Sequence, residues 1–140
     1  LDGRDIPVAE EELPAPHRGV TAIPRAVEGQ PEDPVPEALV LGEKEGLPLP
    51  ALAEALGGGA ARSWVLENRA GNVIADRYPL GFKASLYLKD LNIALAEASE
   101  LGIELAVTRL VAGLSERIVA AGYGDEDVSN FARVVRGEIG

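Results

Sequence analysis

Seven of the ten prolines lie within the first 36 residues, and this uneven distribution divides the chain into two parts. Each proline ring removes a backbone N–H donor and clashes with the preceding turn, so prolines at this density exclude a continuous helix. The same segment holds eight acidic residues against three arginines, and its apolar residues follow no period. We therefore predict that residues 1–35 form an irregular or disordered extension that packs poorly, and that residues 36–136 form the folded domain.

From Pro36 onward, apolar residues recur at spacings of three and four, which is typical of amphipathic helices. Gly46, Gly102 and Gly122 each follow such a segment, as glycine often follows a helix. The expected helices cover residues 37–45, 51–56, 63–69, 82–101 and 104–121, with a last helix after Asp127. No stretch alternates with period two for long enough to form a strand. The predicted fold class is therefore all-α, a helical bundle.

Two long segments supply most of the predicted core. In the segment 82–101 the buried stripe is expected at Leu88, Leu91, Leu95 and Ala98, widened by Leu86, Ile93 and Ala94. In the segment 104–121 it is expected at Val107, Leu110, Val111, Leu114 and Ile118. The width of the first stripe predicts that this helix is central to the bundle.

Charge and composition exclude several classes of protein. The formal net charge is −10, so the chain repels the phosphates of nucleic acids and of anionic membrane surfaces. No apolar run reaches the roughly 20 residues that span a bilayer. The chain has no cysteine, and its one histidine, His17, lies in the proline-rich segment, so neither a histidine cluster nor a thiolate site is available for a metal. We expect a cytoplasmic protein with no nucleic-acid, membrane or metal partner.

The segment from Phe82 to Glu97 carries the most informative pattern. Lys89 lies in the middle of a largely apolar helix, where an ammonium group is costly unless its side chain reaches water or meets an anion. Adjacent residues of a helix do not face each other, so Lys89 and Asp90 are not predicted to form a simple surface pair. The alternative is that both side chains point to water, and the pattern taken alone favours it.

The order and spacing of these residues resemble the cofactor-binding motif of the 3-hydroxyisobutyrate dehydrogenase family, which includes tartronate semialdehyde reductases. The matching residues are Phe82, Lys89, Asp90, Leu91 and Ala94, whereas Asn92 stands where glycine is usual. Weaker matches at familiar spacing cover residues 37–47, 59–64, 98–102 and 122–129. The resemblance extends over residues 36–136. It implies the all-α C-terminal domain found in 6-phosphogluconate dehydrogenase-like proteins, here preceded by an irregular extension.

The resemblance also implies a cofactor and a site. The cofactor is NAD or NADP; Lys89 reaches it near the nicotinamide end, Asp90 orients neighbouring groups, and Phe82 lines the same cleft. Ordinary core packing is the alternative for Phe82. The chain would then be the C-terminal cofactor-binding and dimerisation part of a β-hydroxyacid dehydrogenase, an oxidoreductase that acts on the CH–OH group of a small 3-hydroxy acid or on the corresponding semialdehyde. The competing class is a non-enzymatic helical module for oligomerisation or interaction.

Two parts that this family uses for hydride transfer do not occur among the 140 residues. The G-x-G-x-x-G turn of a Rossmann domain is missing. So is the G-x-G-x-x-x-K-x-x-x-N pattern that supplies the catalytic lysine, because the first lysine is Lys44. We therefore expect no catalytic residue in this chain and no activity of the chain alone. We also expect a homo-oligomer or association with a Rossmann-bearing chain. A fused segment, a frame-shifted translation and a diverged tail each remain compatible with residues 1–35.

Overall fold

The computed structural model describes residues 34–140, and every regular element in that range is helical. Residues 1–33, which hold almost all of the predicted extension and His17, lie outside the described part. The elements are α2 (Val35–Lys44), α3 (Leu49–Gly57), α4 (Trp64–Ala75), α5 (Ala84–Glu100), α6 (Ala106–Ala120), the 3-10 turn η1 (Val128–Phe131) and α7 (Ala132–Val135). Over the described range, extended backbone pairs only in one isolated bridge, between Lys83 and Asp127. The all-α prediction is confirmed.

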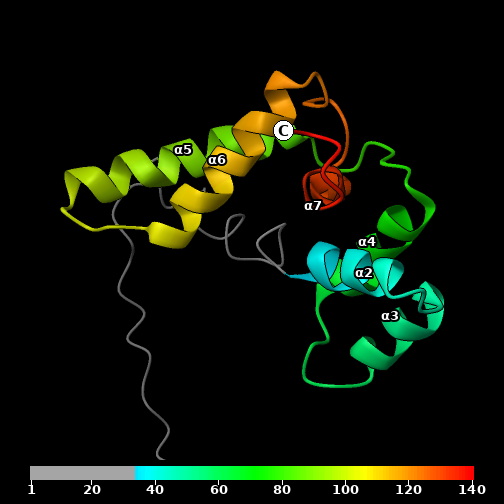
Figure 1. Ribbon diagram of the computed structural model, residues 1–140. Helices are drawn as coiled ribbons and strands as arrows, with labels where there is room; N and C mark the ends of the chain where they lie inside the picture. Colours follow the sequence, from blue (N-terminus) through cyan, green and yellow to red (C-terminus); the bar gives the residue numbers. More distant parts are fainter. Residues whose placement is uncertain (1–33) are drawn as a thin grey trace, which may run out of the picture.

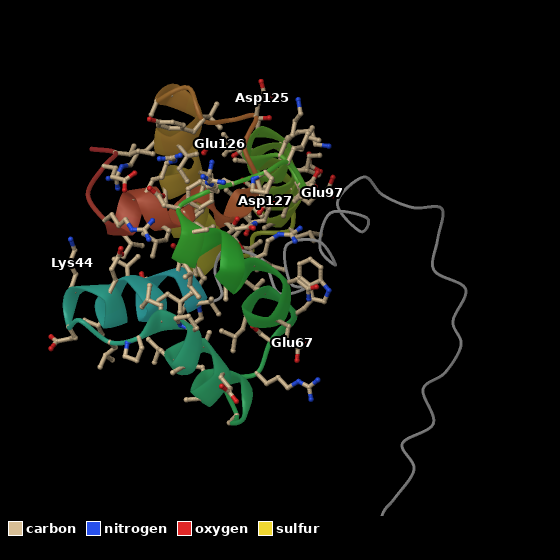
Figure 2. The ribbon with its side chains drawn as sticks, turned by 90° about the vertical axis from the view of Figure 1, so that its right-hand side faces the viewer. Lys44, Glu67, Glu97, Asp125, Glu126 and Asp127 are labelled. Atoms are coloured by element: carbon tan, nitrogen blue, oxygen red, sulfur yellow. The ribbon has the colours of Figure 1, made fainter. Side chains whose placement is uncertain are left out.

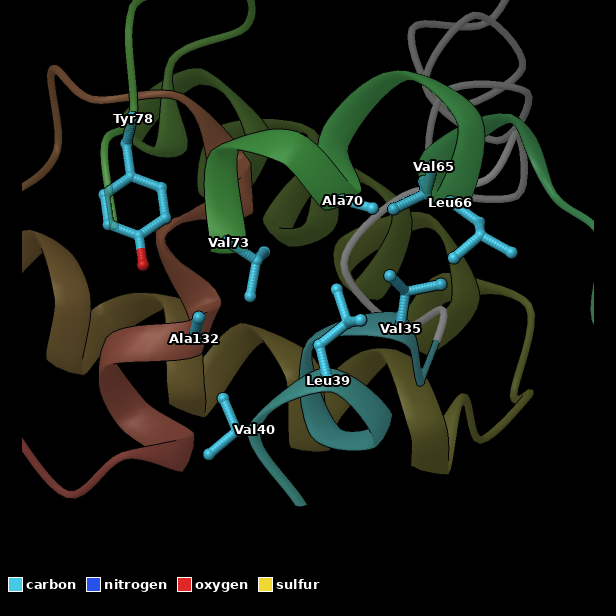
Figure 3. Packing of buried hydrophobic residues seen from close by; sticks show 9 residues of the cluster. All are labelled: Val35, Leu39, Val40, Val65, Leu66, Ala70, Val73, Tyr78 and Ala132. Carbon is cyan, nitrogen blue, oxygen red and sulfur yellow. The ribbon is translucent and has the colours of Figure 1, made fainter. Parts of the chain in front are cut away.

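The helices form two packed groups, which meet at η1 and α7 (Figure 1). Helices α2, α3 and α4 surround the first apolar cluster, whose nine buried side chains converge between α2, α4 and α7 (Figure 3). The members of that cluster are Val35, Leu39, Val40, Val65, Leu66, Ala70, Val73, Tyr78 and Ala132. Helices α5 and α6 run side by side and bury the second cluster, made of Ala84, Tyr87, Leu91, Val111, Ala112, Ile118, Val128, Phe131 and Ile139.

Several helix ends follow from the residues that predict them. Ser63 caps α4, because its hydroxyl accepts a hydrogen bond from the Leu66 N–H at 3.1 Å. Gly46, Gly102 and Gly122 have φ angles of +73°, +68° and +91°, a left-handed conformation that glycine adopts without steric cost. The predicted roles of these residues as helix boundaries are confirmed.

Several predicted boundaries differ from the structure, most of them by one or two residues. Helix α4 continues past Arg69 to Ala75, because Gly71 is accommodated inside it and the left-handed Asp76 follows it. The segment after Asp127 is not one helix, since the Asn130 N–H bonds to the Asp127 carbonyl three residues back and forms a 3-10 turn before α7. Helix α2 begins at Val35, two residues before the expected start at residue 37.

Helix α5 buries much of the stripe that its sequence predicts. Leu91, Ala94 and Ala98 are buried, whereas Leu86 is 45% exposed. Tyr87 takes the place expected for Leu86 and is 1% exposed. In the first turns of α5, the buried face is therefore shifted by one residue from the predicted face. The reason is that this part of the helix faces η1 as well as α6.

Helix α6 is covered along only part of its apolar face. Val111 and Ile118 are buried, as predicted. Val107 and Leu110 are 67% and 65% exposed, so the prediction that they are buried is wrong. The reason is that the tip of the α5–α6 hairpin extends away from the α2–α4 group (Figure 1). Among the described elements, α6 packs mainly on α5 and η1, so the tip exposes apolar surface.

Arg136, just after α7, is the main polar link from the C-terminal segment to α2 and α4. Its guanidinium donates to Glu43 Oε2 at 2.9 Å, to Asp76 Oδ1 at 3.0 Å and to the Val73 carbonyl at 2.9 Å. It also donates to the Tyr78 hydroxyl at 3.0 Å. The Val73 carbonyl belongs to the last turn of α4, where a cation is favourable. The Arg136 side chain is only 10% exposed, and its bonds to the Val73 carbonyl and the Tyr78 hydroxyl are partly buried, whereas the Glu43 and Asp76 carboxylates are more exposed.

We predict that Arg136→Ala lowers the free energy of unfolding by about 1–3 kcal/mol, because it leaves several partly buried acceptors without a donor. The matched control is Arg62→Ala. Arg62 pairs with Glu67, but their side chains are 70% and 45% exposed, so its loss costs within about 0.5 kcal/mol. Chemical denaturation of both variants measures the two values. Equal losses would contradict the structural role given to Arg136.

A second prediction concerns Tyr78 and alkaline pH. Burial and the hydrogen bond that its hydroxyl donates to Asp76 together raise the pKa of Tyr78 to about 12, against the opposing effect of the Arg136 cation. A tyrosine in the unfolded state has a pKa of about 10, so the folded chain holds this proton more tightly than the unfolded chain. The resulting stability is complete below pH ~10 and is lost as pH rises towards 12. Tyr78→Phe should therefore lose less unfolding free energy than wild type between these pH values, as measured by denaturation at each pH. Parallel pH profiles would refute the assignment.

Candidate functional site

The first turns of α5 are held by the loop that follows α6. Helix α5 has no side-chain cap. Instead, the Ala84 N–H donates to the Glu126 carbonyl at 3.0 Å, and the Ser85 N–H donates to the Gly124 carbonyl at 2.9 Å. The first N–H groups of a helix need partners from outside it. The loop at residues 122–127 therefore sets where α5 begins and which way it points.

Lys89 and Asp90 lie in the second turn of α5 and differ sharply in burial. The Lys89 side chain is 56% exposed and the Asp90 side chain is 5% exposed. Lys89 Nζ nevertheless lies 3.0 Å from Asp90 Oδ1. The two residues pair because the long lysine side chain bends back over its neighbour, but with Asp90 buried they are not a simple surface pair, in agreement with the prediction. The alternative, in which both point to water, is wrong for Asp90. The result is an exposed ammonium group held by a buried carboxylate.

Phe82 lies two residues before α5 and is held through both of its backbone groups. Its N–H donates to Asp127 Oδ2 at 2.9 Å, and its carbonyl accepts from the Val128 N–H at 3.0 Å. Its ring lies edge-on to Tyr87, with 6.3 Å between ring centroids, and packs against the second apolar cluster. The second apolar cluster thus covers part of the surface of the Phe82 ring, as the core-packing alternative expects. Phe82 takes no part in the Lys89–Asp90 ion pair.

Asp127 brings three segments of the chain together at the start of α5. Its side chain is fully buried. The residue lies on the loop between α6 and η1 and is labelled in Figure 2. Oδ1 accepts from the Ser129 N–H at 3.0 Å and from the Ser129 hydroxyl at 2.6 Å, and it lies 3.0 Å from Arg69 Nε. Oδ2 accepts from the Phe82 N–H. One carboxylate therefore joins α4, η1 and the segment that precedes α5.

Arg69 completes this cluster from the α4 side. Its guanidinium lies over the Trp64 ring, 4.8 Å from the centroid, and its side chain is 21% exposed. A Cβ atom at Gly81 would lie 2.7 Å from both Arg69 Nη2 and Asp127 Oδ2, so a larger residue there would displace these side chains. The sequence predicts Asp127 only as a helix cap and gives no prediction for Arg69. The available signal is that Arg69 stands three residues after the buried Leu66, on the apolar stripe of α4.

A separate apolar groove lies where α2 begins, between α6 and α7. Its volume is about 300 Å³. The lining residues are Pro34, Pro36, Glu37, Val107, Leu110, Val111, Leu114, Phe131, Val134 and Val135. We call this surface the α6 groove. Its one carboxylate and many aliphatic side chains suit apolar protein surface rather than the phosphates of a dinucleotide.

Residues 34–140 contain neither a metal-binding group nor a membrane-spanning helix. No three histidine, cysteine or acidic side chains there come together as a metal-binding group. None of the helices in this range combines the length and apolar character that crossing a membrane requires.

Sequence comparison relates the chain to small-molecule dehydrogenases. The 2-hydroxy-3-oxopropionate reductase of Escherichia coli (strain K12) is 35% identical over 101 residues, which are 72% of this chain and 35% of that protein. The L-threonate dehydrogenase of Haemophilus influenzae is 29% identical over 101 residues, or 72% of this chain and 34% of that protein. The chain thus spans about a third of the length of these relatives.

Solved structures share the fold. The 3-hydroxyisobutyrate dehydrogenase of Salmonella typhimurium matches with a TM-score of 0.74 and 26% identity, over 82% of this chain and 40% of that one. The 3-hydroxyisobutyrate dehydrogenase of Mycobacterium tuberculosis, solved with L-serine, matches in fold with a TM-score of 0.69 and 23% identity, over 85% of this chain and 42% of that one. The family pattern described as the NAD-binding domain of NADP-dependent 3-hydroxyisobutyrate dehydrogenase matches residues 34–135. The resemblance seen in the sequence is confirmed, and the chain belongs to this family of dehydrogenase NAD-binding domains.

Proposed function

We propose that the chain supplies the C-terminal part of the NAD(P) site of a β-hydroxyacid dehydrogenase, and that Lys89 contacts the dinucleotide. The observation that carries this proposal is the Lys89–Asp90 pair, in which an ammonium group that is 56% exposed is held at 3.0 Å by a buried carboxylate. A lysine restrained in this way loses less side-chain entropy on binding an anionic oxygen. Its remaining N–H donors suit the phosphate or ribose oxygens of NAD or NADP.

Asp90 and Phe82 have supporting roles in this proposal. Asp90 orients the Lys89 ammonium, since it is buried and accepts from the end of that side chain. Phe82 offers the part of its ring that the second apolar cluster leaves uncovered. That apolar surface suits the edge of a cofactor cleft, where ring contacts and a few polar groups together fix a ligand.

The proposed reaction is the NAD(P)-dependent oxidation of a small 3-hydroxy acid, or the reverse reduction of its semialdehyde, in the cytoplasm. The relatives include enzymes named for L-threonate and for 2-hydroxy-3-oxopropionate, and these names support the proposed class of substrate. Hydride transfer also requires a domain that holds the dinucleotide and a proton donor beside the substrate oxygen. A Rossmann-bearing chain or segment supplies both in this proposal, and the 140 residues supply no catalytic residue.

We further propose that another protein chain covers the α6 groove and the tip of the α5–α6 hairpin. Val107 and Leu110 line the groove and are each about two-thirds exposed, and Leu101 and Ile103 are exposed at the tip. A contiguous apolar surface of this kind is typical of an interface. The partner is a second copy of the chain, which gives a homo-oligomer, or the Rossmann-bearing chain of the complete enzyme.

The proposed function is tested by complementation with a Rossmann-bearing chain. The purified 140-residue chain alone should not turn over 3-hydroxyisobutyrate or tartronate semialdehyde with NAD or NADP. In the complemented enzyme, Lys89→Ala should weaken dinucleotide binding by about 1–3 kcal/mol, the cost of losing a charge-assisted hydrogen bond. Asp90→Asn should weaken it less. Fluorescence titration with NADH and NADPH measures both.

Lys44→Ala is the matched control, because it removes the same charge from the exposed last turn of α2. It should leave dinucleotide affinity unchanged. Unchanged affinity in Lys89→Ala would refute the role of Lys89. Turnover by the chain alone would refute its dependence on a Rossmann-bearing chain, and no dinucleotide binding in any complex would favour the non-enzymatic interaction module.

Association is tested with two leucines that are equally exposed. Leu110 in the α6 groove and Leu41 on α2 are each 65% exposed. We expect wild type to associate in light scattering, and Leu110→Ser to weaken that association by about 5–30-fold, as loss of a buried interface side chain does. Leu41→Ser should behave as wild type. A wild-type chain that is strictly monomeric, with or without the Rossmann-bearing chain, would contradict the proposed interface.

A further inference from the structure

The buried cluster around Asp127 lies beside the proposed cofactor contact, not within it. The carboxylate binds the backbone of Phe82, two residues before α5, and Lys89 stands in the second turn of that helix. The same carboxylate contacts Arg69 on α4 and Ser129 on η1. The helix that carries Lys89 is thus fixed at its start to two other elements through one side chain.

We propose that Asp127 is a positioning residue, which sets the direction of α5 and thereby places the Lys89 ammonium for the dinucleotide. This inference rests on the proposed role of Lys89. The carboxylate acts through Phe82 and the start of α5 and does not itself touch the cofactor.

The geometry of a helix converts a small change at its start into a larger one at Lys89. Ala84 and Lys89 are separated by roughly 7–8 Å along the axis, at about 1.5 Å per residue. A tilt of about 10° at the start therefore moves the Lys89 backbone by roughly 1 Å, a misplacement of the size that costs enzymes large factors in rate. A positioning role is thus compatible with full folding of the variant.

The chemistry of the cluster makes an asparagine variant informative. Both oxygens of Asp127 accept from N–H donors. An asparagine has one oxygen and one NH₂ group, so in either orientation its NH₂ group faces the Phe82 N–H or the donors of Ser129 and Arg69. The side chain keeps its size while one set of bonds is lost. The close approach of Gly81, where a Cβ would lie 2.7 Å from Asp127 Oδ2, leaves little room for the cluster to rearrange.

The sign of the effect separates positioning from charge. Asp127→Asn removes a negative charge, which by itself strengthens the binding of an anionic dinucleotide. Loss of positioning weakens it. Asp125→Asn is the matched control, because Asp125 lies in the same loop and carries the same charge, but its side chain is 86% exposed and its partner is the exposed Lys83.

The test combines amide hydrogen exchange in the full chain with NADPH titration of the complemented enzyme. In Asp127→Asn we expect exchange at the Phe82 amide to accelerate about tenfold relative to the Ser85 amide, which bonds to the Gly124 carbonyl instead. We expect NADPH binding to weaken about tenfold in the same variant. Asp125→Asn should change both by less than about twofold. Where Asp127→Asn does not fold, Arg69→Gln, which removes the ion pair to α4, should show the same pattern more weakly.

Each other outcome overturns the inference. Exchange that accelerates equally along α5 in the variants means that Asp127 contributes stability alone. Wild-type NADPH affinity in Asp127→Asn, or in Arg69→Gln where that variant is used, removes the positioning role if Lys89→Ala still weakens binding. If Lys89→Ala also binds NADPH with wild-type affinity, the proposed role of Lys89 is refuted, and this inference is refuted with it.

Discussion

The buried carboxylate of Asp127 is the interaction on which the placement of the helices around it depends. A charge withdrawn from water is tolerated only when donors or an opposite charge surround it. Asp127 accepts hydrogen bonds from Phe82 and Ser129 and forms an ion pair with the Arg69 guanidinium. Apolar contacts are not directional and allow two packed groups to slide or rotate. Hydrogen bonds to a fully buried group allow much less, because a shift leaves the charge without a donor. The carboxylate therefore defines a direction that the two apolar clusters alone do not define.

The two apolar clusters and the polar links have different roles in the structure. Each cluster stabilises its own group of helices, and the polar links set how the groups meet. Arg136 connects the segment after α7 to the ends of α2 and α4, and Asp127 connects α4 to the start of α5. Both links reach the C-terminal end of one helix or the N-terminal end of another, where unpaired backbone groups require partners. The short segment from η1 to Arg136 carries part of both links, which explains why so little regular structure suffices there.

The sequence predicts the helices better than it predicts their surroundings. Apolar periodicity and glycine positions locate the helices because both depend on local backbone geometry. Periodicity also shows which face of α6 is apolar, but it does not show whether another element covers that face. For this reason it wrongly predicts that Leu110 is buried. The pairing of Arg69 with Asp127 joins residues far apart in the chain and has no local signature. The rule that adjacent residues of a helix point in different directions does not predict the Lys89–Asp90 pair. The rule describes Cβ directions, and a lysine side chain is long enough to bend back to its neighbour.

The exposed ammonium of Lys89 and the uncovered α6 groove have a common explanation in the proposed function. A bound cofactor buries most of its surface, whereas the edge of one helix touches only one side of it. The opposite side must come from the Rossmann domain, and an apolar interface that holds this domain nearby makes the second contact effectively intramolecular. Binding of the dinucleotide and binding of the partner are then linked. Whatever factor the partner adds to dinucleotide affinity, the dinucleotide adds to partner affinity, because the two free energies close one thermodynamic cycle. In the proposed function, this domain therefore helps to determine how tightly the cofactor is held without supplying a catalytic group.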